Sequence, residues 1–201
     1  NAEWESNFSP ILVEDRCQIR ASFHAPMPEL DYDILINPQM SFGTGHHETT
    51  HMMVAEMLAI DFAHKSVLDM GCGTGVLAIL AEKRKASQGL AIDIDEWSYH
   101  NTLENIALNQ CASVEVRLGD RQAIGKDTFD IILANINRNI LIDDMTVYSN
   151  ALLEGGEILF SGFYLEDRPI ITEAAEKNGL KFSGERARNG WAMLRFQKAP
   201  R

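Results

Sequence analysis

Short apolar runs alternate with longer amphipathic stretches from Ser66 onward, which is the pattern of alternating strands and helices. The apolar runs predict five buried strands, at 66–71, 89–94, 113–118, 129–135 and 157–162. The stretches between and after them predict helices at 76–85, 96–110, 138–153 and 167–179. Strands joined through helices of this length imply right-handed crossovers and a parallel sheet covered on both faces.

Two of the predicted helices carry further signals. Tyr99, Leu103 and Ile106 follow a spacing of four and then three residues, which predicts the apolar face of the helix over 96–110. The helix over 138–153 is followed by Gly155–Gly156, which we interpret as its end.

The two ends of the chain differ from this pattern. Residues 180–187 and 190–198 predict an antiparallel hairpin at one edge of the sheet. Residues 17–23 and 33–38 are candidate strands, and 24–31 is a proline-bearing loop. We therefore divide the chain into an N-terminal linker or extension, 1–40, and a main domain, 41–201, with a doubly wound, mostly parallel, seven-stranded sheet.

Composition narrows the possible partners. The chain has 201 residues, with 29 Asp and Glu against 18 Lys and Arg, a net charge of −11. An acidic surface repels phosphate backbones, so we expect no tight nucleic-acid binding and consider a basic partner suitable; acidity that only aids solubility is the alternative. Cys17, Cys72 and Cys111 are widely spaced, and no signal peptide or membrane-spanning run is present. We therefore expect a cytoplasmic protein that is a monomer.

Residues 47–51 read HETTH, the H-E-x-x-H pattern of zinc proteases. On a helix this spacing places His47 and His51 on one face, with Glu48 as a candidate general base. However, the pattern fixes only three positions, and no third ligand is evident in the sequence. We therefore expect no metal at these residues, and zinc-dependent hydrolysis remains a remote alternative.

The stretch VLDMGCGTGVLAI (67–79) carries the strongest signal for chemistry. A predicted strand delivers Asp69 and then glycines at alternate positions, Gly71, Gly73 and Gly75, before a helix begins. Glycines let a backbone approach a ligand closely, and open α/β sheets bind ligands at the carboxyl ends of their strands. The spacing differs from the dinucleotide pattern G-x-G-x-x-G because Val76 takes the next place.

An acidic residue ends the next predicted strand. Asp93 lies 22 residues beyond Gly71, where a carboxylate can accept both hydroxyls of a ribose. Asp95 precedes Glu96 and suits the N-cap of the following helix. We assign Asp95 to the cap and Asp93 to the ribose, and together the two signals favour a nucleoside cofactor.

The glycine loop, D-x-G-x-G-x-G, resembles that of class I S-adenosylmethionine-dependent methyltransferases, whose Rossmann-like sheet also has a last antiparallel strand inserted near its edge. SFGTGHHETT (41–50) is similar to the F-G-T-G-x-H-x-T-T motif of the bacterial ribosomal protein L-eleven methyltransferases. The opening residues 2–20, ANIN at 134–137 and SGF at 161–163 match that family in order. The resemblance implies transfer of methyl groups from S-adenosyl-L-methionine to lysine ε-amines and an N-terminal α-amine of a basic ribosomal protein.

The resemblance also implies a set of site residues. The cofactor contacts would fall on the glycine loop and on Phe42, Thr44, Thr50, Asp93, Asp120 and Asn135. The chain departs from the family pattern at His46, Glu48 and Asn137. The family's separate N-terminal substrate domain does not match any part of these residues, so we expect a further region upstream.

Several of these residues also have an alternative role. Asn135 would hold the acceptor amine through its carbonyl, or cap the helix that follows; Asp120 would contact the adenine amine, or belong to a turn. Trp97 and Trp191 are expected in the core. We expect a neutral amine to attack the sulfonium methyl in line, with positioning and desolvation as the main contributions. A methyltransferase acting on a small molecule or RNA is the alternative function.

Overall fold

The structure is a computed structural model that describes residues 8–38 and 46–200. Its main sheet has seven strands in the order β6-β5-β4-β7-β8-β10-β9. In chain order they are β4 (Ser66–Met70), β5 (Gln88–Asp93), β6 (Val114–Leu118), β7 (Phe129–Asn135), β8 (Leu152–Tyr164), β9 (Leu180–Arg188) and β10 (Trp191–Lys198). The first five run parallel, and β10 is antiparallel to both β8 and β9. The predicted doubly wound sheet with a C-terminal hairpin is confirmed.

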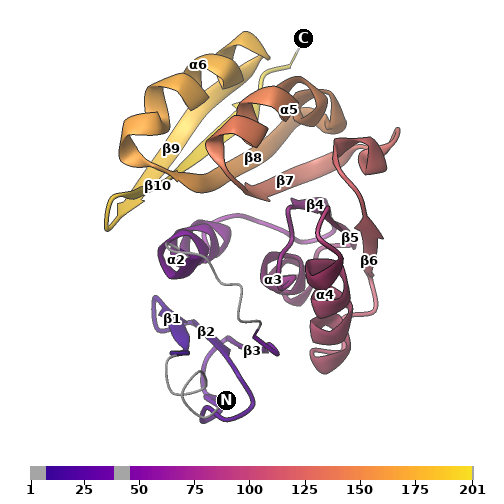
Figure 1. Ribbon diagram of the computed structural model, residues 1–201, viewed down its shortest axis with the longest axis vertical. Helices are drawn as coiled ribbons and strands as arrows, with labels where there is room; N and C mark the ends of the chain where they lie inside the picture. Colours follow the sequence, from indigo (N-terminus) through magenta and orange to yellow (C-terminus); the bar gives the residue numbers. More distant parts are fainter. Residues whose placement is uncertain (1–7, 39–45, 201) are drawn as a thin grey trace.

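Helices cover both faces of this sheet (Figure 1). They are α2 (His46–Met57), α3 (Val76–Lys83), α4 (Glu96–Leu108), α5 (Arg138–Ala151) and α6 (Arg168–Lys177). One core lies between the sheet and α2 and α3, and a second lies between the sheet and α5 and α6. Strand residues alternate between the two: Val67 belongs to the first core and Leu68 to the second, as the two-residue period of a strand requires.

A second, small sheet precedes the main one. Its strands β1 (Ile11–Val13), β2 (Cys17–Arg20) and β3 (Tyr32–Leu35) pack below α2 and α3 (Figure 1). The predicted strands over 17–23 and 33–38 correspond to β2 and β3, whereas β1 was not predicted. Ile11, Val13 and Ile34 share the core of α2 and α3. The domain boundary at residue 40 stays a prediction.

The expected end of one helix is wrong. The helix predicted to reach residue 153 ends at Ala151, and Gly155–Gly156 lie within β8. The peptide amide of Leu152 already bonds back to the helix while its backbone is extended, so the chain passes directly from helix to strand.

The face that α4 buries is largely polar, and the predicted apolar face is confirmed only in part, because Ile106 packs against the first core. Leu103 is 42% exposed, whereas Asn101, Thr102 and Asn105 are buried. Trp97, expected in the core, is 73% exposed; Trp191 is partly buried against the core. Within the described ranges, no helix has the length and apolar character needed to cross a bilayer.

Candidate active site

The glycine loop joins the end of β4 to the start of α3 and has a backbone that only glycine adopts readily. Gly71, Gly73 and Gly75 have φ angles of 73°, 57° and 83°. A Cβ at Gly71 would lie 2.1 Å from Cγ2 of Ile136, and one at Gly75 would lie 2.7 Å from Cγ2 of Thr102. Around Gly73, no described heavy atom lies within 4 Å of that position. Gly71 and Gly75 therefore serve packing, while Gly73 leaves open space for a ligand.

Asp93 ties the end of β5 to this loop. Its Oδ2 accepts a hydrogen bond from the Gly73 amide at 2.9 Å, and its Oδ1 accepts one from the Asp95 amide at 2.9 Å. A carboxylate has about four lone-pair sites, so capacity remains for ligand hydroxyls. Asp95 accepts from the Ser98 amide at 3.2 Å, which confirms it as the N-cap of α4.

Asp69 lies beneath the loop rather than at its open side. It is 1% exposed, and its Oδ2 accepts from the Ala78 amide at 3.1 Å in the first turn of α3. Burial raises the pKa of this carboxyl to about 7, and the charge of Asp93 adds to the effect. The described contacts give Asp69 a part in holding loop and helix together.

The loop also contains an unsatisfied polar group. Thr74 is buried, and its Oγ1 has no hydrogen-bond partner among the residues that the structure describes. A buried hydroxyl without a partner costs free energy. A ligand or a water held at the loop would supply the missing partner, which fits a polar cofactor next to Gly73.

Asn135 ends β7, and strand register places it beside the glycine loop. Met70 pairs with Ala134, so the residues that follow each, Gly71 and Asn135, are neighbours. The Asn135 amide is half-buried and forms no side-chain hydrogen bond with the described part of the chain. Asn137 rather than Asn135 caps α5, because its Oδ1 accepts from the Ile140 amide at 3.0 Å. The interpretation of Asn135 as a cap is therefore wrong.

Asp120 lies just beyond the end of β6 and is exposed. Its Oδ1 accepts from the Gln122 amide at 2.9 Å, which makes it the N-cap of the short 3-10 helix η1 (Arg121–Ile124). The turn interpretation is thus confirmed, and contact with an adenine amine stays a prediction. The structure brings the strand-end residues of β6, β5, β4 and β7 to one edge of the sheet.

Thr50 and the histidines lie on α2. Thr50 is 1% exposed, and its Oγ1 lies 3.5 Å from the Nε2 of His46. Burial lowers the pKa of His46 to about 4, so this ring is neutral near pH 7. Phe42 and Thr44, two of the predicted cofactor contacts, lie outside the described residues, as does the whole F-G-T-G stretch at 42–45.

The H-E-x-x-H residues do lie on a helix. His47, in its first turn, is exposed and has its Nε2 3.4 Å from the Ser9 carbonyl oxygen. His51 is partly buried, which lowers its pKa. Glu48 accepts a hydrogen bond from Asn189 at 3.2 Å. Within residues 8–38 and 46–200, no three His, Cys, Asp or Glu side chains are arranged to hold a metal; the expected lack of zinc stays a prediction.

The sequence analysis did not predict the α4 side chains that hydrogen-bond to the backbone of the glycine loop. Thr102 donates from its Oγ1 to the Gly73 carbonyl at 2.9 Å, and Asn105 donates to the Thr74 carbonyl at 2.8 Å. Both come from the buried polar face of α4. The signal was present as Asn101, Thr102 and Asn105, three small polar residues on one helical face, but it competed with the apolar spacing of Tyr99, Leu103 and Ile106.

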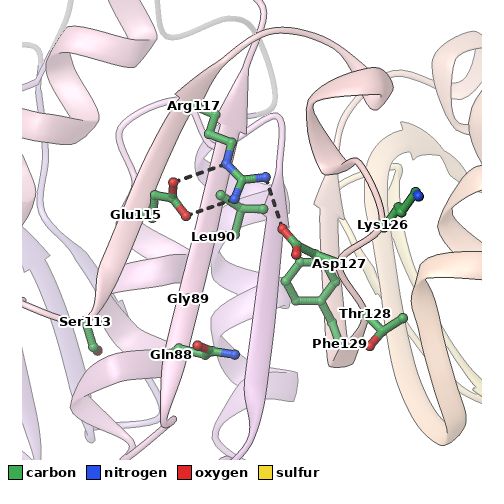
Figure 2. A pocket seen from close by; sticks show the side chains of 10 residues that line it. All are labelled: Gln88, Gly89, Leu90, Ser113, Glu115, Arg117, Lys126, Asp127, Thr128 and Phe129. Carbon is green, nitrogen blue, oxygen red and sulfur yellow. Dashed lines mark hydrogen bonds and ion pairs between the residues drawn. The ribbon is translucent and has the colours of Figure 1, made fainter.

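A groove at the opposite end of the sheet offers less chemistry. It has a volume of about 460 Å³ and lies at the amino ends of β5, β6 and β7. Figure 2 shows Arg117 bonded to Glu115, at 3.0 Å, and to Asp127, at 3.1 Å, while Lys126 points away from them. The guanidinium is already neutralised by its partners, so we place the active site at the carboxyl ends of the strands.

Known proteins of similar sequence cover the whole described fold. The family model for "Ribosomal protein L11 methyltransferase (PrmA)" matches residues 1–199. A ribosomal protein L11 methyltransferase of Porphyromonas gingivalis is 54% identical over 98% of this chain and 68% of its own length. One of Bacteroides fragilis is 52% identical over 98% of this chain and 71% of its own length.

Solved structures agree. The crystal structure of a ribosomal protein L11 methylase from Lactobacillus delbrueckii subsp. bulgaricus superimposes with a TM-score of 0.87 at 27% identity, covering 96% of this chain and 99% of that one. M. jannaschii TYW2 in complex with AdoMet, at 23% identity and a TM-score of 0.60, shares the fold over 79% of this chain and 77% of its own. The glycine loop, the strand-end residues and the family match together show that the chain belongs to the ribosomal protein L11 methyltransferase family, whose members are S-adenosylmethionine-dependent enzymes.

Proposed function

We propose that this protein transfers methyl groups from S-adenosylmethionine to amino groups of ribosomal protein L11, at lysine ε-amines and the N-terminal α-amine. The observation that carries the proposal is that the glycine loop lies between the ends of β5 and β7, which carry Asp93 and Asn135. Gly73 bonds to Asp93 on one side. On the other side the pairing of β4 with β7 places Asn135, whose side-chain amide has no partner among the described residues. The name of these relatives supports ribosomal protein L11 as the substrate.

The residues present fit the cofactor. Asp93 would accept hydrogen bonds from the ribose hydroxyls of the cofactor. The open space beside Gly73 would admit a polar part of the cofactor, which would also give the Thr74 hydroxyl a hydrogen-bond partner. Thr50, Phe42, Thr44 and Asp120 complete the set that the family resemblance assigns. S-adenosylmethionine supplies an electrophilic methyl group on a sulfonium centre.

The chain's own contribution is positioning. A lysine amine has an ordinary pKa of about 10.4 and reacts only after losing its proton. The side-chain carbonyl of Asn135 would accept an N–H of the neutral amine and orient its lone pair. None of the described residues stands out as a general base, so we assign proton removal to solvent.

The acidic surface supports a basic partner. A net charge of −11 attracts a positively charged protein and repels nucleic acid. All three cysteines are free and buried, which supports our proposal that the enzyme acts in the cytoplasm. A monomeric state and the lack of tight nucleic-acid binding stay predictions.

Labelled methyl transfer tests the proposal. The chain and labelled S-adenosylmethionine are incubated in three separate reactions. One contains total ribosomal protein, one ribosomal RNA and one a metabolite extract. We expect label in a single ribosomal protein, with mass spectrometry placing added methyl groups on lysines and the α-amine of L11. Label in RNA or in small molecules alone would contradict the proposed substrate and favour the alternative acceptors.

A further inference from the structure

A groove continues from the candidate site along the carboxyl ends of β7 and β8. Asn135 pairs with Ser161 in the sheet, and the groove begins just beyond this pair, at Asn137 and Gly162. Its volume is about 460 Å³. Gly162, at a φ of 100°, forms part of its wall; a Cβ there would lie 2.5 Å from the Ile136 carbonyl oxygen.

One negative charge in this groove is unpaired. Asp167 is 8% exposed and is engaged twice: its Oδ1 accepts from Arg138 at 2.9 Å and its Oδ2 from the Tyr164 amide at 3.0 Å. Glu166, in the 3-10 helix η2 (Leu165–Asp167), is exposed. Its carboxylate forms no ion pair or hydrogen bond within the ranges that the structure describes. The groove therefore presents Glu166 as a free acidic group.

Tyr164 lines the same groove as Glu166. Tyr164 is 47% exposed, and its ring packs on Trp191 with centroids 4.3 Å apart and planes inclined by 34°. An aromatic surface beside a carboxylate suits a long aliphatic side chain with a cationic end, because the stem packs on the ring while the charge meets the acid. Lysine and arginine have this character.

We propose that this groove binds a lysine or arginine side chain of the protein substrate that flanks the acceptor amine. The proposal rests on the proposed function. The occupant is a flanking residue because a nearby carboxylate raises the pKa of an amine, and the reacting amine must be neutral. Glu166 would hold a charged neighbour instead, a contact made equally before and during the reaction, so that it adds to the affinity for the substrate next to Asn135.

The test compares Glu166→Gln and Glu166→Lys with a matched control, Glu154→Gln. Glu154 is also exposed, also without a side-chain partner in the described ranges, and lies near the amino end of β8. The substrate is intact ribosomal protein L11. We expect KM to rise about fivefold for Glu166→Gln at low salt and further for Glu166→Lys. The kcat of Glu166→Gln should stay within about twofold of the parent, because the groove contacts a flanking residue. The control should match the parent.

Salt and direct binding complete the experiment. We expect the difference between the Glu166 variants and the parent to shrink in 0.5 M salt, about where screening becomes short-ranged, while affinity for S-adenosylmethionine does not change. Equilibrium binding of L11 is measured in parallel. Equal KM and equal L11 affinity for the parent and both Glu166 variants would overturn the groove assignment. Glu166-dependent binding without any methyl transfer would support the groove and instead overturn the proposed function.

Discussion

Asp93 accepts two backbone hydrogen bonds, one from the glycine loop and one from the residue that caps α4. Each bond to an ionised carboxylate is worth about 1.5–3 kcal/mol. The carboxylate is therefore fixed before a ligand arrives, and no ordering of the side chain is needed on binding. A single residue thus serves both the local structure and, in our proposal, the ribose.

Replacing Asp93 should separate these roles. For Asp93→Ala we expect affinity for S-adenosylmethionine to fall by about 10- to 100-fold, the equivalent of one or two charge-assisted hydrogen bonds. Calorimetry on the purified variant measures it. Asp95→Ala is the matched control: it loses the cap of α4, at about 1 kcal/mol of stability, but should keep cofactor affinity. Unchanged affinity in a folded Asp93→Ala protein would refute the ribose assignment.

Asp69 makes the stability of the protein depend on pH. Its folded-state pKa of about 7 exceeds the ordinary value near 3.9. Between these two values the folded protein holds a proton that the unfolded chain has released. The stability contribution is therefore fully present below about pH 4 and is lost as pH rises through 7.

The variant Asp69→Asn removes this titration. We expect the free energy of unfolding of the parent, relative to that of the variant, to decrease from pH 4 to pH 7.5 by up to about 4 kcal/mol. Urea unfolding at several pH values measures both proteins. Parallel curves across this range would show that Asp69 keeps an ordinary pKa in the folded protein.

At the scale of elements, α4 connects the glycine loop to the segment that leaves β3. Asn105 is fully buried; it donates to the Thr74 carbonyl at 2.8 Å and accepts from the Asn37 amide at 2.7 Å. Among the described residues, the side chain of Asn109, one turn later, bonds to its own helix and to Leu35 at the end of β3, donating to the Leu35 carbonyl at 2.6 Å and accepting from the Leu35 amide at 3.1 Å. The helix therefore fixes two chain segments through side-chain amides.

These two asparagines offer a matched comparison. Asn105→Ala and Asn109→Ala should each lower stability by about 1–3 kcal/mol, because each leaves buried or partly buried backbone groups without their side-chain partner. Of these two variants, only Asn105→Ala should also weaken S-adenosylmethionine binding, by about tenfold, because Asn105 bonds to the Thr74 carbonyl of the glycine loop and Asn109 does not bond to that loop. Thermal unfolding and calorimetry on the same samples measure both effects. Equal cofactor affinity in the two variants would show that the loop keeps its geometry without this support.

The order of strands and helices was predictable because buried strands and glycine loops leave local signals. The polar character of the buried face of α4 was not predictable from the sequence. The apolar spacing at Tyr99, Leu103 and Ile106 competed with the signal from buried amides, whose partners lie far along the chain. Gly155–Gly156 misled for a related reason: glycine follows many helices, but here it lies in the long strand β8. The Gly73–Asp93 bond joins two strand ends, so it depends on sheet pairing that sequence distance does not reveal.

At the scale of the whole molecule, α2 is held from both sides. The carboxylate of Glu56 is 9% exposed and pairs with Arg186 at 2.8 Å and Arg195 at 3.0 Å, on β9 and β10. Glu14, beside the small sheet, contacts Arg186 at 3.7 Å. The C-terminal strands, the helix carrying Thr50 and the small N-terminal sheet are therefore parts of one charged network and one core.

The relatives are longer than the stretch they share with this chain, which covers 68% of the Porphyromonas gingivalis protein. The predicted cofactor residues lie within the shared stretch, whereas the family resemblance implies that substrate choice belongs largely to an N-terminal domain. Binding energy from such a remote domain lowers the barrier at the reacting amine as well as KM. We therefore expect the 201-residue chain to bind S-adenosylmethionine normally but to methylate intact L11 slowly.

Joining the upstream segment of the Porphyromonas gingivalis relative to this chain should restore turnover. We expect kcat/KM on intact L11 to rise at least about tenfold, equivalent to about 1.4 kcal/mol of added transition-state stabilisation, with cofactor affinity unchanged. A fusion to an unrelated domain of similar size is the control and should give no increase. Equal rates for the chain and its extended version would show that recognition lies within these residues, in which case the loop at 24–31 and the groove at Glu166 become the surfaces to test by substitution.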